Sequence, residues 1–350
     1  MRLKTIKELN LKNKRVLIRC DFNLPMEKGK ILDDFRMRAS LPTINYLIDK
    51  GAKLILISHL GKPGGKVIEE LRLDPIAKKL KELLKKEVLK LNDCIGKEVE
   101  RAVFSLREKE ILLLENIRFY PQEEINDLNF AKSLAHLGEF FINEAFSVSH
   151  RNHASIVSLP KFLPPAVGFL FEKEIKNLEK FLKKYQRPLV AIIGGKKIKD
   201  KAPLVKKFSE IGDWVLLNHL IWREIKKTFL KDNLKNNIIP PADGIGEKDI
   251  GPETIRIFKE KILKAKTVFW NGPLGRIEEK EYQNGTKEIA LSILESKSFS
   301  LIGGGETIEF INKLHITQKF SFVSTGGGAM LKFLAGEELP GLKILGYYGD

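Results

Sequence analysis

The chain of 350 residues is long enough for two domains, and 43% hydrophobic with 30% charged residues is ordinary for a globular protein. No apolar run could span a bilayer, and the charged N-terminus lacks the apolar core of a secretory signal, so we expect a cytoplasmic protein without a membrane partner. Two cysteines, Cys20 and Cys94, are too few for a disulfide framework or a metal cluster, and the formal net charge of +16 favours an anionic partner.

Nucleic acid is one anionic partner that this net charge would fit. The lysines are spread through helical patterns such as Ala77–Lys86 and Lys173–Lys184, and they form neither a basic tail nor an RNA-binding motif. Such spacing is typical of helix faces exposed to solvent. We therefore expect no nucleic-acid partner, and only the net charge supports the alternative.

Apolar, β-branched runs alternate with helical patterns in the first half of the chain. They predict strands at Arg15–Cys20, Lys53–Ile57, Ile111–Leu114 and Phe140–Ile142, with helices at Arg36–Leu47, Pro75–Lys85 and Leu128–Leu137. This alternation is typical of βαβ units in a parallel sheet, which binds its ligands at the carboxyl ends of the strands.

A proline-rich break at Pro160–Pro165 precedes a long helical pattern, Phe169–Lys184, after which the alternation restarts. The later strands are predicted at Leu189–Ile193, Trp214–Leu217, Thr267–Trp270, Phe299–Ile302 and Phe320–Val323. We predict an α/β fold of two doubly wound, Rossmann-like parallel-sheet domains joined by a long helix. The expected segments are residues 1–165, 166–186, 187–335 and 336–350, the last returning toward the N-terminal domain.

Three glycine-containing turns follow predicted strands of the second half, in Ala191–Asp200, Leu301–Thr307 and Phe322–Gly328. Glycine at a strand-to-helix turn lets backbone N–H groups approach phosphate oxygens. None of the turns is a dinucleotide fingerprint or a GxxxxGK[ST] loop. One such turn alone would indicate only a tight connection, but three predict a polyphosphate site, most simply for a nucleotide.

Cationic side chains stand at the ends of successive strands in the first half. They are four arginines, one lysine and three histidines: Arg19, Arg36, His59, Lys62, Arg118, His150, Arg151 and His153. Arginine forks suit phosphate and carboxylate oxygens, and the nearby Asp21 and Asn23 could bond a hydroxyl. The pattern predicts a small, strongly anionic, hydroxylated ligand. Zinc on the three histidines is a competing interpretation, without cysteine or HExxH spacing to support it.

A series of longer motifs contains these residues. In chain order they read DFNLP, SHLGKP, LLLENIRFYPQEE, NEAFSVSHRNHAS, GGKKIKDK, FWNGPLG, NGTKEIA, LIGGGET and FVSTGGGAML. From about Lys14 to the C-terminus the chain resembles the phosphoglycerate kinases. The resemblance implies reversible phosphoryl transfer between 1,3-bisphosphoglycerate and ADP, giving 3-phosphoglycerate and ATP in glycolysis. It also implies Mg²⁺, two lobes that close by hinge bending, and a protein that we expect to be a monomer.

By this resemblance residues 1–165 bind the acid substrate, 3-phosphoglycerate. The implied set is Arg19, Asp21, Phe22, Asn23, Arg36, His59, Leu60, Gly61, Lys62, Arg118, His150, Arg151 and His153. Lys62 stands where the family usually has the arginine of SHLGRP. It keeps the charge but loses the fork, so slightly weaker substrate binding is expected.

Residues 187–335 would bind the nucleotide. The implied set is Gly194, Gly195, Lys197, Lys201, Asn271, Glu278, Gly303, Gly304, Gly305, Glu306 and Thr307. The implied catalytic residues are Lys197, Lys201 and Arg36, which counter charge at the transferring group. Glu306 replaces the aspartate of GGGDT that holds Mg²⁺ with the nucleotide phosphates. Lys196 replaces the usual alanine of GGAK, and the motif assigns it no role.

One stretch departs from the family pattern. Where a GGGMAFTF turn would line the adenine pocket, the chain has Asn218–Trp222 without glycine, and no strand is expected from there to Pro240. Leu220 and Ile221 fit either a ligand role or a helix packed on the sheet. The altered stretch favours one alternative function, a catalytically impaired anion-binding protein, while the retained lysines and GGGE turn favour the enzyme.

Overall fold

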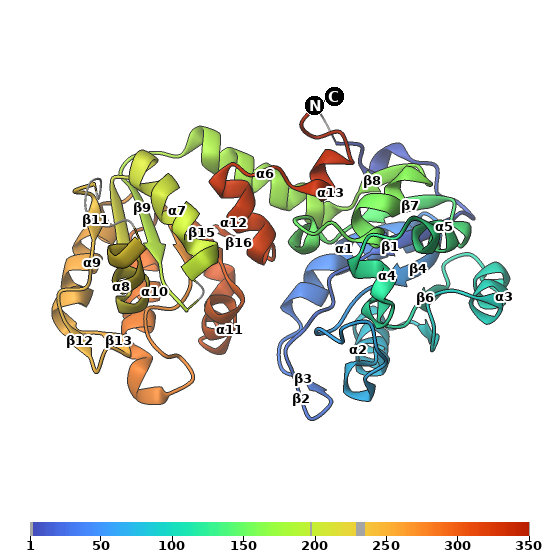
Figure 1. Ribbon diagram of the computed structural model, residues 1–350, viewed down its shortest axis with the longest axis horizontal. Helices are drawn as coiled ribbons and strands as arrows, with labels where there is room; N and C mark the ends of the chain where they lie inside the picture. Colours follow the sequence, from blue (N-terminus) through green and yellow to red (C-terminus); the bar gives the residue numbers. More distant parts are fainter. Residues whose placement is uncertain (1–2, 197, 229–234, 350) are drawn as a thin grey trace. The chain divides into compact units, whose positions relative to one another are not determined.

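The computed structural model describes residues 3–196, 198–228 and 235–349. The chain divides into two compact units, Met1–Ile175 with Glu338–Asp350 and Lys176–Glu337 (Figure 1). Each unit contains one six-stranded sheet in which every neighbouring pair of strands is parallel. No helix among these residues is both long and apolar enough to cross a bilayer.

The sheet of the first unit has the strand order β5-β6-β4-β1-β7-β8. Its strands are β1 (Arg15–Arg19), β4 (Lys53–Ile57), β5 (Leu89–Lys90), β6 (Ile111–Leu113), β7 (Phe140–Asn143) and β8 (Pro165–Val167). The helices are α1 (Phe35–Asp49), α2 (Asp74–Leu84), α3 (Lys97–Ser105), α4 (Pro121–Glu124), α5 (Leu128–His136) and α13 (Pro340–Lys343). A short antiparallel hairpin, β2 (Met26–Glu27) and β3 (Lys30–Ile31), lies outside the sheet.

Helices cover both faces of this sheet because alternate side chains of a strand point to opposite faces. Along β1, Val16 and Ile18 pack into a core that includes Leu47 of α1 and Leu80 of α2. Leu17 packs into a second core with residues of α3 and α5. The near-continuous apolar strands are therefore those of a parallel sheet buried on both sides.

The C-terminal segment completes the first unit. Helix α13 packs beside the segment Ala154–Ser158, and the Gly341 N–H donates a 2.8 Å hydrogen bond to the Ser149 carbonyl. A Cβ on Gly341 would lie 2.9 Å from atoms of Ser149 and Ile156, so the helix lies in close contact with this part of the unit. Residues far apart in the sequence thus share one core.

The sheet of the second unit has the strand order β11-β10-β9-β14-β15-β16. Its strands are β9 (Leu189–Ile193), β10 (Trp214–Leu217), β11 (Ile238–Ile239), β14 (Thr267–Asn271), β15 (Phe299–Gly303) and β16 (Phe322–Val323). The helices are α7 (Ile198–Ile211), α8 (His219–Thr228), α9 (Pro252–Lys264), α10 (Asn284–Glu295), α11 (Gly305–Lys313) and α12 (Gly327–Ala335), and β12 (Gly244–Ile245) pairs with β13 (Asp249–Ile250) in a separate hairpin.

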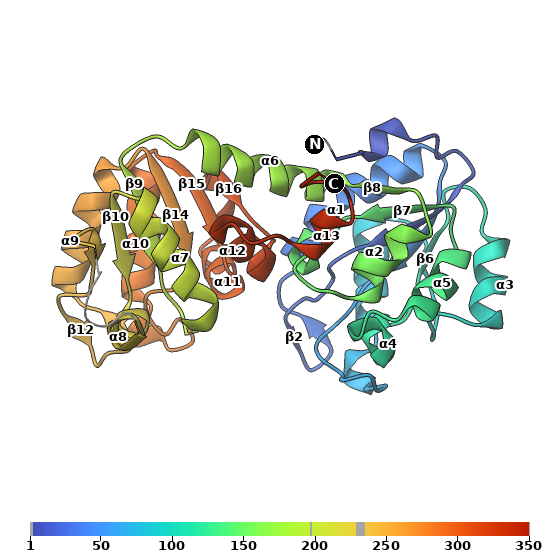
Figure 2. The same cartoon turned by 45° about the horizontal axis from the view of Figure 1, so that its top comes forward.

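Helices cover both faces here as well (Figure 2). Trp270 of β14 packs in the core with Phe258 of α9 and Ile289 of α10. The neighbouring Phe269 stacks on Phe208 of α7, with ring centroids 4.6 Å apart. Two doubly wound α/β units confirm the predicted fold class.

The predicted connecting helix is present as α6 (Phe169–Lys184), which leaves the first unit and enters the second. At its start the Phe169 N–H donates to Thr43 Oγ1 at 2.8 Å, and the Leu170 N–H donates to Glu144 Oε1 at 3.1 Å. Burial raises the pKa of Glu144 to about 8, although hydrogen bonds from the Thr43 side chain and the Leu170 and Phe171 N–H groups oppose the shift. The buried Glu144 carboxyl group therefore caps the helix.

Three sequence expectations differ from the structure. The last residue of the break predicted at Pro160–Pro165 is the first residue of strand β8. Proline is tolerated at this position because β8 is an edge strand. The two-residue strand β5 was not predicted. The expected lack of a strand before Pro240 is wrong, because β11 pairs with β10 through Ile238 and Ile239. All three strands are short edge strands, which give little periodic signal. The predicted domain boundaries stay predictions.

Candidate functional site

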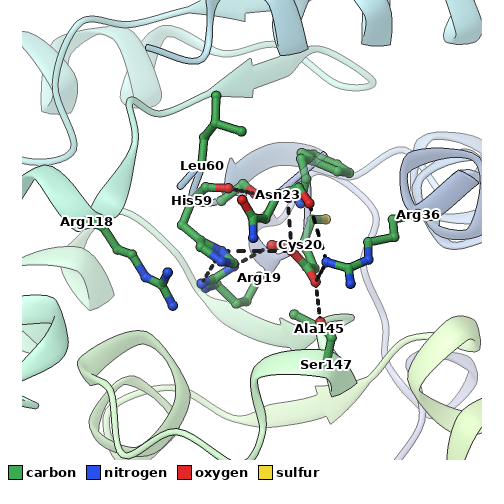
Figure 3. Close-up of polar contacts among 12 residues, drawn as sticks. Arg19, Cys20, Asn23, Arg36, His59, Leu60, Arg118, Ala145 and Ser147 are labelled. Atoms are coloured by element: carbon green, nitrogen blue, oxygen red, sulfur yellow. Dashed lines mark hydrogen bonds and ion pairs between the residues drawn. The ribbon is translucent and has the colours of Figure 1, made fainter. Parts of the chain in front are cut away.

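One candidate site lies in the first unit, just beyond the carboxyl end of β1. Asp21 accepts a 3.0 Å hydrogen bond from Arg36 and a 3.1 Å bond from the Asn23 N–H, and it is also bonded by the Ser147 hydroxyl (Figure 3). Burial favours a higher pKa for Asp21, but the charge of Arg36 together with these hydrogen bonds outweighs it and holds the pKa below its usual range. Asp21 is therefore ionised and fixes the Arg36 fork.

A loop after β4 links three of the predicted residues. The Gly61 N–H donates to Asn23 Oδ1 at 2.8 Å, and the Gly61 carbonyl accepts from Arg118 at 2.9 Å. Gly61 has φ +64°, and a Cβ there would lie 2.8 Å from Leu71 Cδ2, so only glycine fits without strain. Asn116 holds the same loop through the Leu60 carbonyl at 2.8 Å. The loop thus sets the distance between Asn23 and Arg118.

Two histidines of the site are buried beside arginines. Burial and the Arg19 charge lower the pKa of His59 well below its usual value. Burial, Arg118 and Arg19 lower the pKa of His153 to about 3, and its Nδ1 lies 3.7 Å from Glu123 Oε1. Both rings are therefore neutral at physiological pH, and they can offer hydrogen bonds but no charge.

The predicted residues differ in their exposure. Lys62 and Arg151 are exposed, His150 is half-buried, and Phe22 and Leu60 are buried. Arg19 is fully buried and makes hydrogen bonds only inside the protein, so it differs from Arg36, whose side chain is 27% exposed. In the part of the chain that the structure describes, no three His, Cys, Asp or Glu residues are grouped to hold a metal ion, so the zinc alternative gains no support.

Sequence reasoning missed several side chains of this site. Ser147 bonds Asp21, while Ser155 bonds both Arg19 and Glu123. All three missed residues lie inside the motifs NEAFSVSHRNHAS and LLLENIRFYPQEE. A search for hydroxyls and acids flanking the cationic positions could have found them, but an isolated serine gives no chemical signal of its own.

A second candidate site lies in the other unit. Lys201 is buried, donates to the Gly194 carbonyl and lies 3.3 Å from the Asn271 carbonyl oxygen. The Gly194 N–H donates to the same Asn271 carbonyl at 2.9 Å. A Cβ on Gly272 would collide with the Gly194 carbonyl oxygen. The turns after β9 and β14 therefore meet, and Lys201 joins them.

The turn after β15 contacts the turn after β14. Thr307 Oγ1 accepts a 2.9 Å hydrogen bond from the Gly272 N–H. Helix α11 begins at Gly305, after Gly304, and Glu306 stands exposed in its first turn. Gly303 packs on the Met330 side chain. Unsatisfied N–H groups at such a helix start favour phosphate oxygens.

A cleft in this unit is lined by predicted and unpredicted residues. They are Gly195, Lys196, Asn218, His219, Leu220, Glu247, Lys248, Pro273, Leu274, Gly275, Arg276, Glu278 and Glu306. Lys196 Nζ lies 3.0 Å from Glu278 Oε1 at its wall. Lys197, the predicted catalytic lysine, lies outside the described residues.

The stretch that departs from the family pattern, Asn218–Trp222, forms the start of α8. Asn218 Oδ1 accepts a 2.9 Å hydrogen bond from the Ile221 N–H, which makes Asn218 the cap of the helix. Ile221 is fully buried, as the helix interpretation predicts, whereas Leu220 is half-buried and lines the cleft. His219 Nε2 lies 3.2 Å from the Asp243 carbonyl oxygen. The start of a helix, which contacts the residue before β12 through His219, thus stands where the family pattern has a glycine turn.

Comparison with known proteins identifies similar chains. The family model described as phosphoglycerate kinase matches residues 6–236 and 219–337. Phosphoglycerate kinases of Dictyoglomus turgidum and Coprothermobacter proteolyticus are 43% identical over 394 residues and 42% identical over 391 residues, and each alignment covers 99% of both chains. The crystal structure of phosphoglycerate kinase from Pyrococcus horikoshii OT3 has a TM-score of 0.88 at 32% identity and covers 98% of both chains.

Proposed function

Because the chain belongs to the phosphoglycerate kinase family, we propose that it transfers a phosphoryl group reversibly between 1,3-bisphosphoglycerate and ADP, giving 3-phosphoglycerate and ATP in glycolysis. The observation that carries the proposal is the Asp21–Arg36 pair beside the loop that joins Asn23, Gly61 and Arg118. It offers arginine forks and hydroxyl-bonding groups within one connected network. Neither the comparisons nor the described residues favour the catalytically impaired alternative.

The acid substrate carries a phosphate, a hydroxyl and a carboxylate, and the first unit offers a partner for each. Arg118 and the exposed Arg151 suit the anionic ends, since guanidinium forks bind such oxygens in bidentate geometry. Asp21 is ionised and can accept from the hydroxyl. Arg36 stands beside Asp21 at 3.0 Å, where it can counter charge on the reacting carboxylate.

The nucleotide phosphates would lie at the turns after β9, β14 and β15. Lys201 and the N-terminus of α11 supply positive charge and N–H donors there. Mg²⁺ fits Glu306, because this exposed carboxylate needs only nucleotide phosphates and water to complete an oxygen shell. Bound there, Mg²⁺ would neutralise charge on the phosphates.

The transfer needs no protein nucleophile. In the direction of ATP use, a carboxylate oxygen of 3-phosphoglycerate forms a bond to the terminal phosphorus, the bond to the bridging oxygen breaks, and the electron pair stays on ADP. A carboxylate carries no proton, so no general base is required. The chain therefore contributes positioning and charge neutralisation, which dominate phosphoryl transfer. Hinge closure, a monomeric state and a cytoplasmic location belong to the proposal.

An assay with 3-phosphoglycerate and ATP tests the function, with product detected through a coupled dehydrogenase. Arg36→Met should raise the KM for 3-phosphoglycerate at least about tenfold, because a charge-assisted contact is lost. The matched control is Arg38→Met on the same helix, where Arg38 is exposed and pairs with Asp34 at 2.7 Å. The KM of the Arg38→Met variant for 3-phosphoglycerate should equal that of the parent. Absence of turnover by the parent, or equal behaviour of the two variants, would contradict the proposal.

A further inference from the structure

Arg19 is a fully buried arginine whose hydrogen bonds all end inside the first unit. Its Nε donates to Ser155 Oγ at 2.9 Å, one terminal nitrogen donates to the Cys20 carbonyl, and the other lies 3.2 Å from His59 Nδ1 (Figure 3). The side chain has no exposed surface with which to reach a ligand. A cation in this position differs from Arg36 and Arg151, whose side chains reach the surface and can bind a substrate directly.

The contact with Arg19 decides where the His59 ring carries its proton. A guanidinium group can only donate, so Nδ1 of His59 must accept. A neutral imidazole with an accepting Nδ1 carries its proton on Nε2. Nε2 has no hydrogen-bond partner among the residues with described positions, so this N–H remains for a ligand. Asp21 Oδ1 lies 4.0 Å from Nδ1, too far to replace Arg19 as a hydrogen-bond partner.

Two further buried residues hold Arg19 in place. The Ser155 hydroxyl donates to Glu123 Oε1 at 2.6 Å, so its lone pairs face the Arg19 Nε–H. The Ser155 N–H donates to Glu123 Oε2 at 2.9 Å, and Glu123 is fully buried. The connected order is therefore Glu123, Ser155, Arg19 and His59. Glu123 orients the Ser155 hydroxyl, and the Arg19 guanidinium donates to both Ser155 and His59.

We propose that Arg19 is a positioning residue for His59, which it holds as the Nε2–H tautomer so that the ring donates a hydrogen bond to an anionic oxygen of the acid substrate. Glu123 and Ser155 set the position of Arg19. The ligand role of His59 rests on the proposed function. The tautomer itself does not, because it is a property of the ligand-free protein.

Nitrogen-15 NMR of the histidine rings tests the tautomer without any substrate. The chain has 6 histidines, and a His59→Gln sample identifies the signal of His59. Between about pH 6 and pH 8 the parent should show an unprotonated Nδ1 and a protonated Nε2, since burial, Arg19, Arg118 and Arg36 disfavour a second proton more than Asp21 favours it. Arg19→Met should give mixed tautomers. A protonated Nδ1 in the parent, or an unchanged signal in Arg19→Met, would overturn the proposal.

A double-mutant cycle tests whether Arg19 acts through His59. Arg19→Met and His59→Gln should each raise the KM for 3-phosphoglycerate about tenfold, on the scale of one hydrogen bond to a charged group. The double variant should lose no more than His59→Gln alone, whereas a direct substrate contact by Arg19 would make the losses multiply. Additive losses would overturn the proposal even if the NMR result agreed.

Glu123→Gln is the variant to use if Arg19→Met does not fold. Glutamine keeps the shape of the side chain, but one of its two ends is a donor that cannot accept from Ser155. We expect a smaller rise in KM than for Arg19→Met, an unchanged kcat and a detectable population of the second tautomer. A Glu123→Gln protein with the parent's ring signals and KM would exclude the proposed role of Glu123 and Ser155. If the parent shows no activity but the expected tautomer, the proposed function fails and the tautomer assignment stands.

Discussion

Lys196 Nζ and Glu278 Oε1 lie 3.0 Å apart at the wall of the cleft in the second unit. The two side chains are 54% and 56% exposed, so the pair contributes little to stability. The family motif assigns Lys196 no role, and the structure gives it this carboxylate partner. The pair holds a positive charge beside a site that we expect to receive an anionic ligand.

Lys196→Ala should raise the KM for ADP roughly two- to fivefold, on the scale of an exposed charge pair. The variant loses a cation and leaves the Glu278 charge uncompensated, and both changes disfavour an anion. The effect should shrink at high salt. Lys313→Ala is the control, because Lys313 pairs with Glu309 at 2.7 Å in the same unit and does not line the cleft. An equal change in the control would show that only net charge matters.

Gly61→Ala should weaken 3-phosphoglycerate binding by about tenfold and lower stability by about 1–2 kcal/mol, from the left-handed conformation together with a steric contact. The added methyl group would displace the loop that holds Asn23 and Arg118. Gly64→Ala is a matched control, because its φ is +66° and a Cβ there contacts nothing within 4 Å. Calorimetric titration should show a much larger loss for Gly61→Ala. Similar losses in both variants would contradict the role of the Leu71 contact.

Glu144→Gln should change how stability depends on pH. Below about pH 4.5 the carboxyl group is protonated whether the chain is folded or unfolded. Because burial raises its folded-state pKa to about 8, its contribution to the free energy of unfolding falls as the pH rises and is lost above about 8. Glutamine does not titrate, so the Tm of the variant relative to the parent should increase from about pH 5 to pH 8.5. Thermal unfolding measures this difference, and a constant offset would refute the predicted titration.

Lys197→Ala should lower kcat by roughly a hundredfold or more, the scale of losing one charge-stabilising donor in a transition state. The prediction rests on the GGKKIKDK motif, since Lys197 lies outside the described residues. Substrate affinities should change less. A near-normal kcat under saturating substrates would exclude this role.

Discrimination between ADP and GDP should be weak, within about tenfold, or roughly 1.4 kcal/mol. A helix start capped by Asn218, with Leu220 at the cleft wall, replaces a glycine turn that would bring the backbone close to a purine. Phosphate contacts by Lys201 and the start of α11 do not depend on the base. The ratio of kcat/KM values for the two nucleotides measures the preference, and strong exclusion of GDP would reveal a specific base pocket.

The order of strands and helices was predictable because fully buried parallel strands such as Leu189–Ile193 are continuous apolar runs. Short edge strands were not, because Ile238–Ile239 gives no periodic pattern. The residue types of the anion site were also visible in the sequence. How deeply each side chain is buried could not be predicted, because Arg19 and Arg36 are both arginines at predicted element ends. Only the packing of Ser155 and Glu123 shows that Arg19 is buried.

The second unit is one uninterrupted segment, Lys176–Glu337, whereas the first is built from two separate segments, Met1–Ile175 and Glu338–Asp350. During synthesis, the second unit can finish folding as soon as its own segment has emerged. The first unit cannot, because helix α13 and the Gly341 bond to Ser149 belong to a segment that follows the whole second unit in the sequence. Ser149 is adjacent to His150 of the anion site. A chain that stops before this segment would therefore leave the candidate anion site of the first unit incomplete, although most of that unit is synthesised first.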